Sequence, residues 1–109
     1  MFGDDFEEAF GSFLEKVRRT EEFLNYKATF EAIQDDEGAM GCVESIRELN
    51  MRVMDMDEDE YERESENIAA RMEELCSDSR VSDFILAEVE FSKLYQYITD
   101  GIVSALDEE

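Results

Sequence analysis

Six side chains between residues 55 and 66 occupy the ligand positions of a calcium-binding EF-hand loop. They are Asp55, Asp57, Asp59, Tyr61, Arg63 and Glu66, at positions 1, 3, 5, 7, 9 and 12 of such a loop. Position 6 needs the sharp turn that glycine makes readily, but Glu60 stands there. Tyr61 also begins an apolar pattern with helical spacing, so we interpret this run as a solvated connection between helices and expect no calcium site.

The other groups that could support chemistry are equally incomplete. Carboxylate-bridged iron in helical bundles requires Glu together with a Glu-x-x-His motif, and the chain contains no His. Cys42 and Cys76 are far apart and lack the CxxC spacing of zinc and redox sites, so we expect two buried free thiols. No glycine-rich phosphate loop is present. The sequence therefore predicts a protein that is not an enzyme and has no metal and no cofactor.

The charge balance limits the classes of partner. The chain has 31 acidic and 10 basic residues, a formal net charge of -21, which repels the phosphates of nucleic acids and anionic membranes. No apolar run approaches the roughly 20 residues that span a bilayer. The first ten residues carry four carboxylates where a signal peptide carries Lys or Arg. We expect no direct nucleic-acid binding, no membrane insertion and a cytoplasmic location.

Apolar residues at intervals of three and four predict helices along the whole chain. A first helix, about residues 4–18, places four phenylalanines on one face, with Gly11 interrupting it. A second helix begins after Thr20, a suitable N-cap. The third begins after Asp35, and its apolar stripe extends from Ala39 to Met54. Asn50 falls within that stripe, where it either fixes the register of a buried seam or is exposed.

Two more helices complete the pattern. One begins at about Glu58, and the last is capped by Asp78 or Ser79. A helix from Val81 to Leu106 would be about 39 Å long. Its apolar face is wider than a stripe of two residues per heptad, so we expect it to pack along a partner.

These elements predict an all-α fold. No segment alternates with the period of a strand, and short connections make neighbouring helices antiparallel. We therefore expect one domain, residues 1–109, consisting of about five antiparallel helices in a bundle that oligomerises. The first helix could dock on a partner subunit or be exchanged with it. The candidate residues for an oligomer or partner interface are Phe2, Phe6, Phe10, Phe13, Phe84, Phe91 and Tyr95.

Several short motifs resemble those of the YlbF/YmcA-like family of small helical bacterial proteins, over roughly residues 15–105. They are Thr20-Glu21-Glu22-Phe23 followed by Tyr26-Lys27, the break at Asp35-Asp36-Glu37, the break at Asp78-Ser79-Arg80-Val81, and Phe84 followed by Glu90-Phe91-Ser92-Lys93-Leu94. The family often has Pro at the first helical position after a capping Asp, and this chain has Asp36 and Ser79 instead.

The resemblance implies a cytoplasmic, self-associating regulator that acts by contacting other proteins. Members of the family are associated with competence, sporulation, biofilm formation and messenger RNA processing by an endoribonuclease, so paralogues and such an enzyme are expected partners. Some members carry iron-sulfur clusters on cysteines, but Cys42 and Cys76 form no matching motif. An alternative is an acidic decoy or chaperone for basic nucleic-acid-binding proteins. The charge is equally compatible with solubility or a salty cytoplasm.

Overall fold

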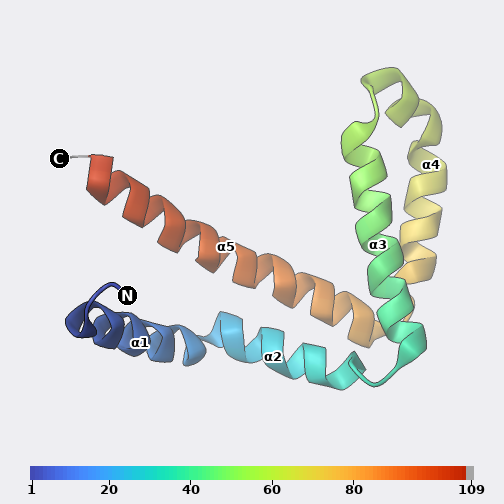
Figure 1. The fold of residues 1–109 in the computed structure, drawn as a ribbon. Helices are drawn as coiled ribbons and strands as arrows, with labels where there is room; N and C mark the ends of the chain where they lie inside the picture. Colours follow the sequence, from blue (N-terminus) through green and yellow to red (C-terminus); the bar gives the residue numbers. More distant parts are fainter. Residues whose placement is uncertain (108–109) are drawn as a thin grey trace. The chain divides into compact units, whose positions relative to one another are not determined.

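The computed structural model describes residues 1–107, and these residues form five α-helices and no strand (Figure 1). The helices are α1 (Asp4–Arg18), α2 (Glu21–Ile33), α3 (Glu37–Asp55), α4 (Glu58–Leu75) and α5 (Ser79–Asp107). The predicted all-α fold with a long last helix is confirmed. The chain divides into two compact units: unit 1 contains residues 1–28 and the chain from residue 87 onward, and unit 2 contains residues 29–86. The expectation of a single domain stays a prediction.

Local side-chain contacts explain where most helices begin. The hydroxyl of Thr20 accepts a hydrogen bond from the backbone N–H of Phe23 at 3.2 Å, as expected for the N-cap of α2. The carboxylate of Asp57 accepts one from the N–H of Glu60 at 2.8 Å and caps α4. The helix α1 continues through Gly11 and has the bounds expected for the first helix.

The start of α3 differs by one residue from the prediction. Asp36, and not Asp35, is the N-cap, because its Oδ1 accepts a hydrogen bond from the N–H of Ala39 at 3.0 Å. Both residues are acidic and both precede the apolar stripe, so the sequence pattern alone does not separate them. The N-cap is the residue whose side-chain oxygen can reach a free backbone N–H two or three residues later.

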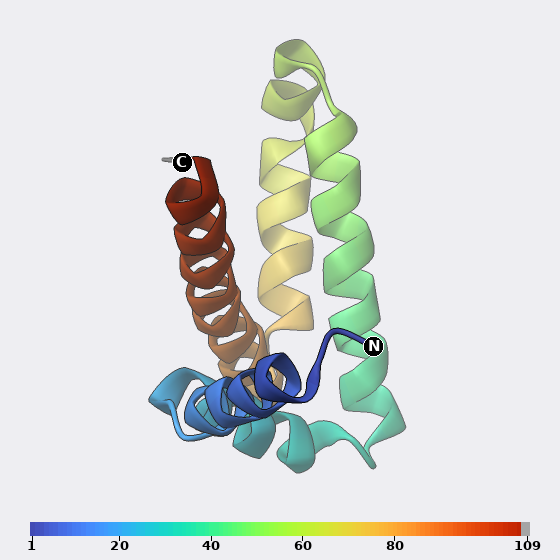
Figure 2. The same cartoon turned by 60° about the vertical axis from the view of Figure 1, so that its left-hand side comes forward.

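Unit 2 contains most of the buried apolar core. Figures 1 and 2 show α3 and α4 side by side as an antiparallel hairpin. Phe84 of α5 is 2% exposed, with its ring centroid 5.9 Å from that of Phe30 in α2. The buried residues of unit 2 are Ile33, Ala39, Val43, Ile46, Leu49, Leu75, Val81 and Phe84.

The buried stripe of α3 ends earlier than its pattern predicted. Leu49 is buried and Asn50 is exposed, so Asn50 does not fix a buried seam. Val53 is half-buried, and Met54 is 84% exposed. The prediction that Met54 is buried is therefore wrong, because the far end of the hairpin has no third helix in unit 2 to cover it.

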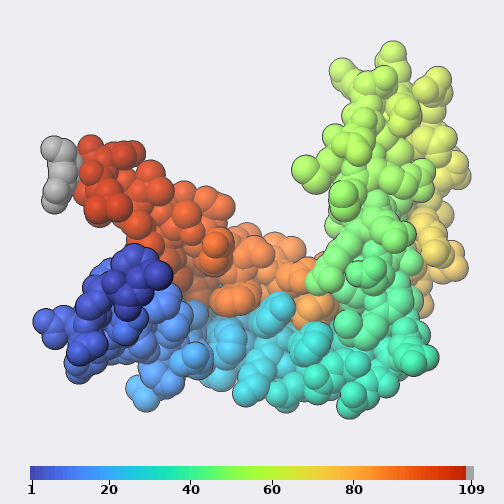
Figure 3. All heavy atoms as spheres, viewed as in Figure 1, coloured from blue at the N-terminus to red at the C-terminus, as the bar shows by residue number. Residues whose placement is uncertain are grey.

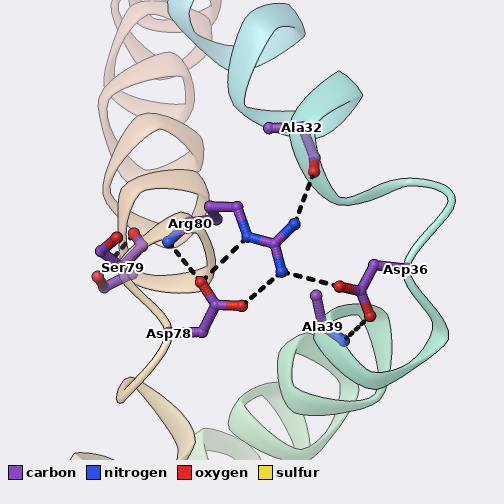
Figure 4. Close-up of polar contacts among 7 residues, drawn as sticks. Ala32, Asp36, Ala39, Asp78, Ser79 and Arg80 are labelled. Atoms are coloured by element: carbon purple, nitrogen blue, oxygen red, sulfur yellow. Dashed lines mark hydrogen bonds and ion pairs between the residues drawn. The ribbon is translucent and has the colours of Figure 1, made fainter.

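Arg80 connects two turns that are far apart in sequence (Figure 4). Its Nη2 donates to Oδ2 of Asp78 at 2.7 Å and to Oδ2 of Asp36 at 2.8 Å. Its Nε donates to Oδ1 of Asp78 at 3.2 Å, and its Nη1 donates to the carbonyl of Ala32 at 3.3 Å. The Arg80 cluster, defined as Ala32, Asp36, Asp78 and Arg80, thus fastens the turn between α2 and α3 to the turn between α4 and α5.

The same contacts change the titration of the two carboxyls. Hydrogen bonds from the Arg80 guanidinium hold the pKa of Asp36 and of Asp78 below the ordinary value of 3.8. All three side chains are partly exposed to solvent, so the cluster orders the turns more than it adds stability.

Replacing Arg80 with Gln is expected to lower the free energy of unfolding at neutral pH. The loss should shrink as the pH falls, because a carboxyl with a lowered pKa stabilises the fold above its ordinary value of 3.8 and loses that contribution as the pH falls through the lowered value. Urea unfolding of both proteins at about pH 7 and at steps below about pH 4 checks this. A difference between the two proteins that stayed constant over this range would contradict the assignment.

Candidate protein interaction surface in unit 1

Unit 1 is almost without a buried core. Of its residues up to 107, only Ala87 is buried, at 7% exposed, and α1 buries none. Its internal packing includes a small aromatic contact, in which the ring centroid of Phe91 lies 5.8 Å from that of Phe23 and 5.1 Å from that of Tyr26. The helices of this unit therefore keep most of their apolar side chains in contact with solvent.

The helix α1 presents an uncovered row of aromatic rings. Spacing of three and four residues places Phe6, Phe10 and Phe13 along one side of the helix, and Phe2 precedes the helix. Their exposed fractions are 71, 60, 53 and 39%, far above those of core residues. Phe2 and Phe6 lie together, with ring centroids 5.9 Å apart. A row of four exposed rings is unusual on a monomer and is typical of a contact surface.

The second half of α5 adds apolar surface beside α1. Phe13 of α1 and residues of α5 line an open, mainly apolar groove. The α5 residues that line this groove are Tyr97, Ile98, Asp100, Gly101, Ile102 and Ala105. Tyr95, Val103 and Leu106 are also exposed on α5. We call Phe2, the three phenylalanines of α1, this groove and the exposed α5 residues the unit 1 surface. The ends of α1 and α5 are visible in Figure 3.

The unit 1 surface also carries acidic groups. Asp4, Asp5, Glu7 and Glu8 alternate with the phenylalanines at the start of α1, and the terminal amine lies 3.4 Å from a carboxylate oxygen of Glu7. Asp100 lines the groove. Any partner that covers the rings must therefore also accept, or screen, this negative charge.

The structure separates the predicted interface residues into three groups by their exposure. Phe2, Phe6, Phe10, Phe13 and Tyr95 are exposed in unit 1. Phe91 is half-buried by its aromatic neighbours in the same unit. Phe84 belongs to the core of unit 2 and contributes nothing to an exposed surface.

Of the α5 residues in this surface, the interface residues predicted from sequence include Tyr95 and none of the others. Tyr97 and Val103 fall outside the main stripe of α5, yet both are exposed beside it. The signal that could have identified them is the breadth of the apolar pattern in α5, which exceeds one helix face.

The described residues contain no cluster of side chains suited to metal chemistry. Residues 1–107 contain no group of three or more side chains suited to a metal, and their core contains no polar side chain. Cys42 and Cys76 are free and half-buried, not fully buried as expected. Two thiols on α3 and at the end of α4 do not fit the ligand set of an iron-sulfur cluster, which requires four donors. Within residues 1–107, no helix is long and apolar enough to cross a bilayer.

The described residues form a small all-α protein whose first helix leaves its aromatic side chains exposed. A family model described as control of competence regulator ComK, YlbF/YmcA, matches residues 8–107. The chain belongs to this family, as its short motifs predicted, and the family is described by a regulatory role and not by a reaction. No curated protein matches the chain, and no solved structure does.

The motifs that carried the resemblance have a structural role. Asp36 from one break and Asp78 and Arg80 from the other meet in the Arg80 cluster. Thr20 caps α2 and Phe23 contacts Phe91, so these motifs also maintain the fold. The motifs that identify the family are therefore residues that hold the helices together. The exposed phenylalanines of the unit 1 surface are not among them.

Proposed function

We propose that this protein is a non-catalytic regulatory adaptor that self-associates through the unit 1 surface and acts by binding other proteins. The observation that supports this most is the exposure of three phenylalanines on α1, a helix that buries none of its residues, and of Phe2 just before it. Membership of a family described by control of the competence regulator ComK supports the regulatory role. Burial of apolar area is the main source of free energy for such association.

A second copy of the chain is the proposed occupant of the unit 1 surface. In a twofold dimer the same patch faces itself, so rings from two α1 helices meet and each can enter the groove beside α5 of the other copy. The connection after α1 is short, since α1 ends at Arg18 and α2 begins at Glu21. A terminal helix joined in this way can pack on its own subunit or be exchanged with the partner.

The proposed heterologous partners follow from the family. We propose a cytoplasmic complex with helical paralogues and with an endoribonuclease, and a role in the control of competence, sporulation, biofilm formation or messenger RNA processing. The family description names only the control of ComK, and the finer roles rest on the resemblance of the motifs.

A second candidate function is supported by the net charge of -21. An acidic decoy or chaperone would bind basic nucleic-acid-binding proteins by imitating their polyanionic ligand. Such binding is mainly electrostatic, so its affinity falls steeply between low and moderate salt. An adaptor with an apolar interface retains most of its affinity over the same range.

Recovery of the tagged protein from a lysate of its native host, at low and at moderate salt, separates the two functions. Helical paralogues or an endoribonuclease identified by mass spectrometry at both salts would support the adaptor. Only basic nucleic-acid-binding proteins, lost at moderate salt, would overturn it and support the decoy.

Self-association is expected to become tighter as salt is added. Two copies that each carry a charge of -21 repel one another, and the carboxylates of α1 lie among the rings that must meet. Screening shortens the range of this repulsion from about 10 Å at 0.1 M salt to about 3 Å at 1 M, while the apolar attraction remains. Sedimentation over this range should give a dissociation constant that falls with salt.

The control for this measurement is circular dichroism at each salt concentration, because a strongly acidic fold can also lose helix when its charges are unscreened. Replacing Glu7 and Glu8 with Gln should flatten the salt dependence, because it removes part of the repulsion. Association that weakened with salt would contradict the apolar interface, since it would indicate opposite charges at the contact.

A further inference from the structure

The far end of the α3–α4 hairpin, in unit 2, leaves several large apolar side chains exposed. We call it the hairpin tip and define it as residues 51–66. Met51, Met54 and Tyr61 are 66, 84 and 46% exposed there. Met51 and Met54 are three residues apart on α3, so their side chains lie on the same side of the helix.

Local folding does not require these side chains. The turn is made by the backbone, with the N–H of Met56 donating to the carbonyl of Val53 at 3.2 Å, and by Asp57, which caps α4. The two exposed methionines take no part in either contact. Polar residues at positions 51 and 54 would form the same helix end with less apolar surface exposed to water.

The hairpin tip also holds the densest negative charge of the chain. Between residues 51 and 66 there are eight carboxylates and two arginines, Arg52 and Arg63. None of the ion pairs among the described residues uses a carboxylate between residues 55 and 62. Apart from Asp57, which caps α4, these carboxylates can attract cations from outside the chain.

We propose that the hairpin tip docks a basic amphipathic helix of a partner protein. Methionine is flexible and polarisable, so it adapts to varied apolar side chains, and the surrounding carboxylates attract Lys and Arg on the opposite edge of the same helix. Nucleic acids and anionic membranes have the wrong charge for this surface. The inference deepens the proposed function, because it gives the adaptor a docking surface distinct from the one that joins its own copies.

The test uses the full-length protein and a synthetic helix with Leu on one face and Lys on the other. The control probe has the same composition in scrambled order, so it carries the charge without the apolar face. Fluorescence anisotropy of the labelled helix should show binding to the protein and at least about tenfold weaker binding of the scrambled probe. Equal binding of both probes would overturn the proposal, because charge alone would then explain it.

Variants then locate the binding. Replacing Met51 and Met54 together with Gln should weaken binding at least about tenfold. Leu86→Gln, which alters an exposed apolar side chain elsewhere in unit 2, is the matched control and should change little. The proposal fails if the double variant binds like wild type, or if Leu86→Gln loses as much affinity as the double variant.

Salt distinguishes failure of this inference from failure of the proposed self-association. Attraction between opposite charges weakens with salt, whereas association of two like-charged copies tightens with it. Neutralising Asp55 and Asp59 with Asn should weaken binding of the helix at low salt and leave self-association unchanged. Binding of the helix that was unaffected both by salt and by these substitutions would overturn the docking mode.

Discussion

Replacing Phe6 with Asp is expected to convert the self-associated protein into a monomer. Phe6 lies within the aromatic row of α1 and is 60% exposed. In the proposed assembly its ring is buried by a second copy, so the substitution removes apolar contact and places a charge where it has no partner. Truncating an aromatic residue at the centre of an interface often costs 2 kcal/mol or more, and each copy carries the change, so we expect a loss of roughly a hundredfold or more in affinity.

Sedimentation at high salt measures this change, and two variants serve as controls. Ser12→Asp adds the same charge to α1 on an exposed residue outside the aromatic row, so it should affect association far less. Asp55→Asn with Asp59→Asn tests the hairpin tip and should have no effect on self-association. Since α1 buries nothing, Phe6→Asp should retain the helical circular dichroism of the wild type at high salt. If Phe6→Asp and Ser12→Asp weakened association equally, net charge and not the aromatic row would control it.

Replacing Phe84 with Ala is expected to have the largest effect on stability. Phe84 is almost fully buried in unit 2, where its ring contacts that of Phe30. Removing a buried Phe ring loses its transfer free energy and leaves a cavity, which together cost about 3–5 kcal/mol. Typical domains are stable by only about 5–15 kcal/mol, so the variant should unfold at a much lower urea concentration.

The matched control is Leu86→Ala, since Leu86 lies on the same helix but is exposed. Its effect should be within about 0.5 kcal/mol of wild type. If Phe84→Ala showed no helical circular dichroism while Leu86→Ala remained folded, that result would also indicate a large loss in the free energy of unfolding. Equal stability of the two variants would contradict the core assigned to unit 2.

The helices were largely predictable because their signals are local. Apolar spacing and capping side chains act within a few residues, so the starts of α2, α4 and α5 follow from Thr20, Asp57 and Asp78. The one-residue difference at Asp36 reflects a choice between adjacent carboxylates, which depends on the geometry of the turn.

Burial was less predictable, because periodicity identifies residues that share a face but not whether anything covers that face. Phe84 and Phe6 both belong to apolar patterns with helical spacing, yet Phe84 is buried and Phe6 is exposed. Met54 continues the stripe of Val43 and Ile46 but lies beyond the end of the packed region. The Arg80 cluster was also beyond prediction, because it joins Asp36 and Arg80 across 44 positions of sequence.

The molar mass of the wild-type protein in solution at high salt, measured by light scattering during gel filtration, tests the central claim most directly. One chain has a mass of 12.7 kDa. An uncovered aromatic face that binds a second copy predicts a whole multiple of this mass at micromolar concentration. A mass of one chain at every concentration and salt would show that the unit 1 surface is not covered by the protein itself, and would contradict self-association.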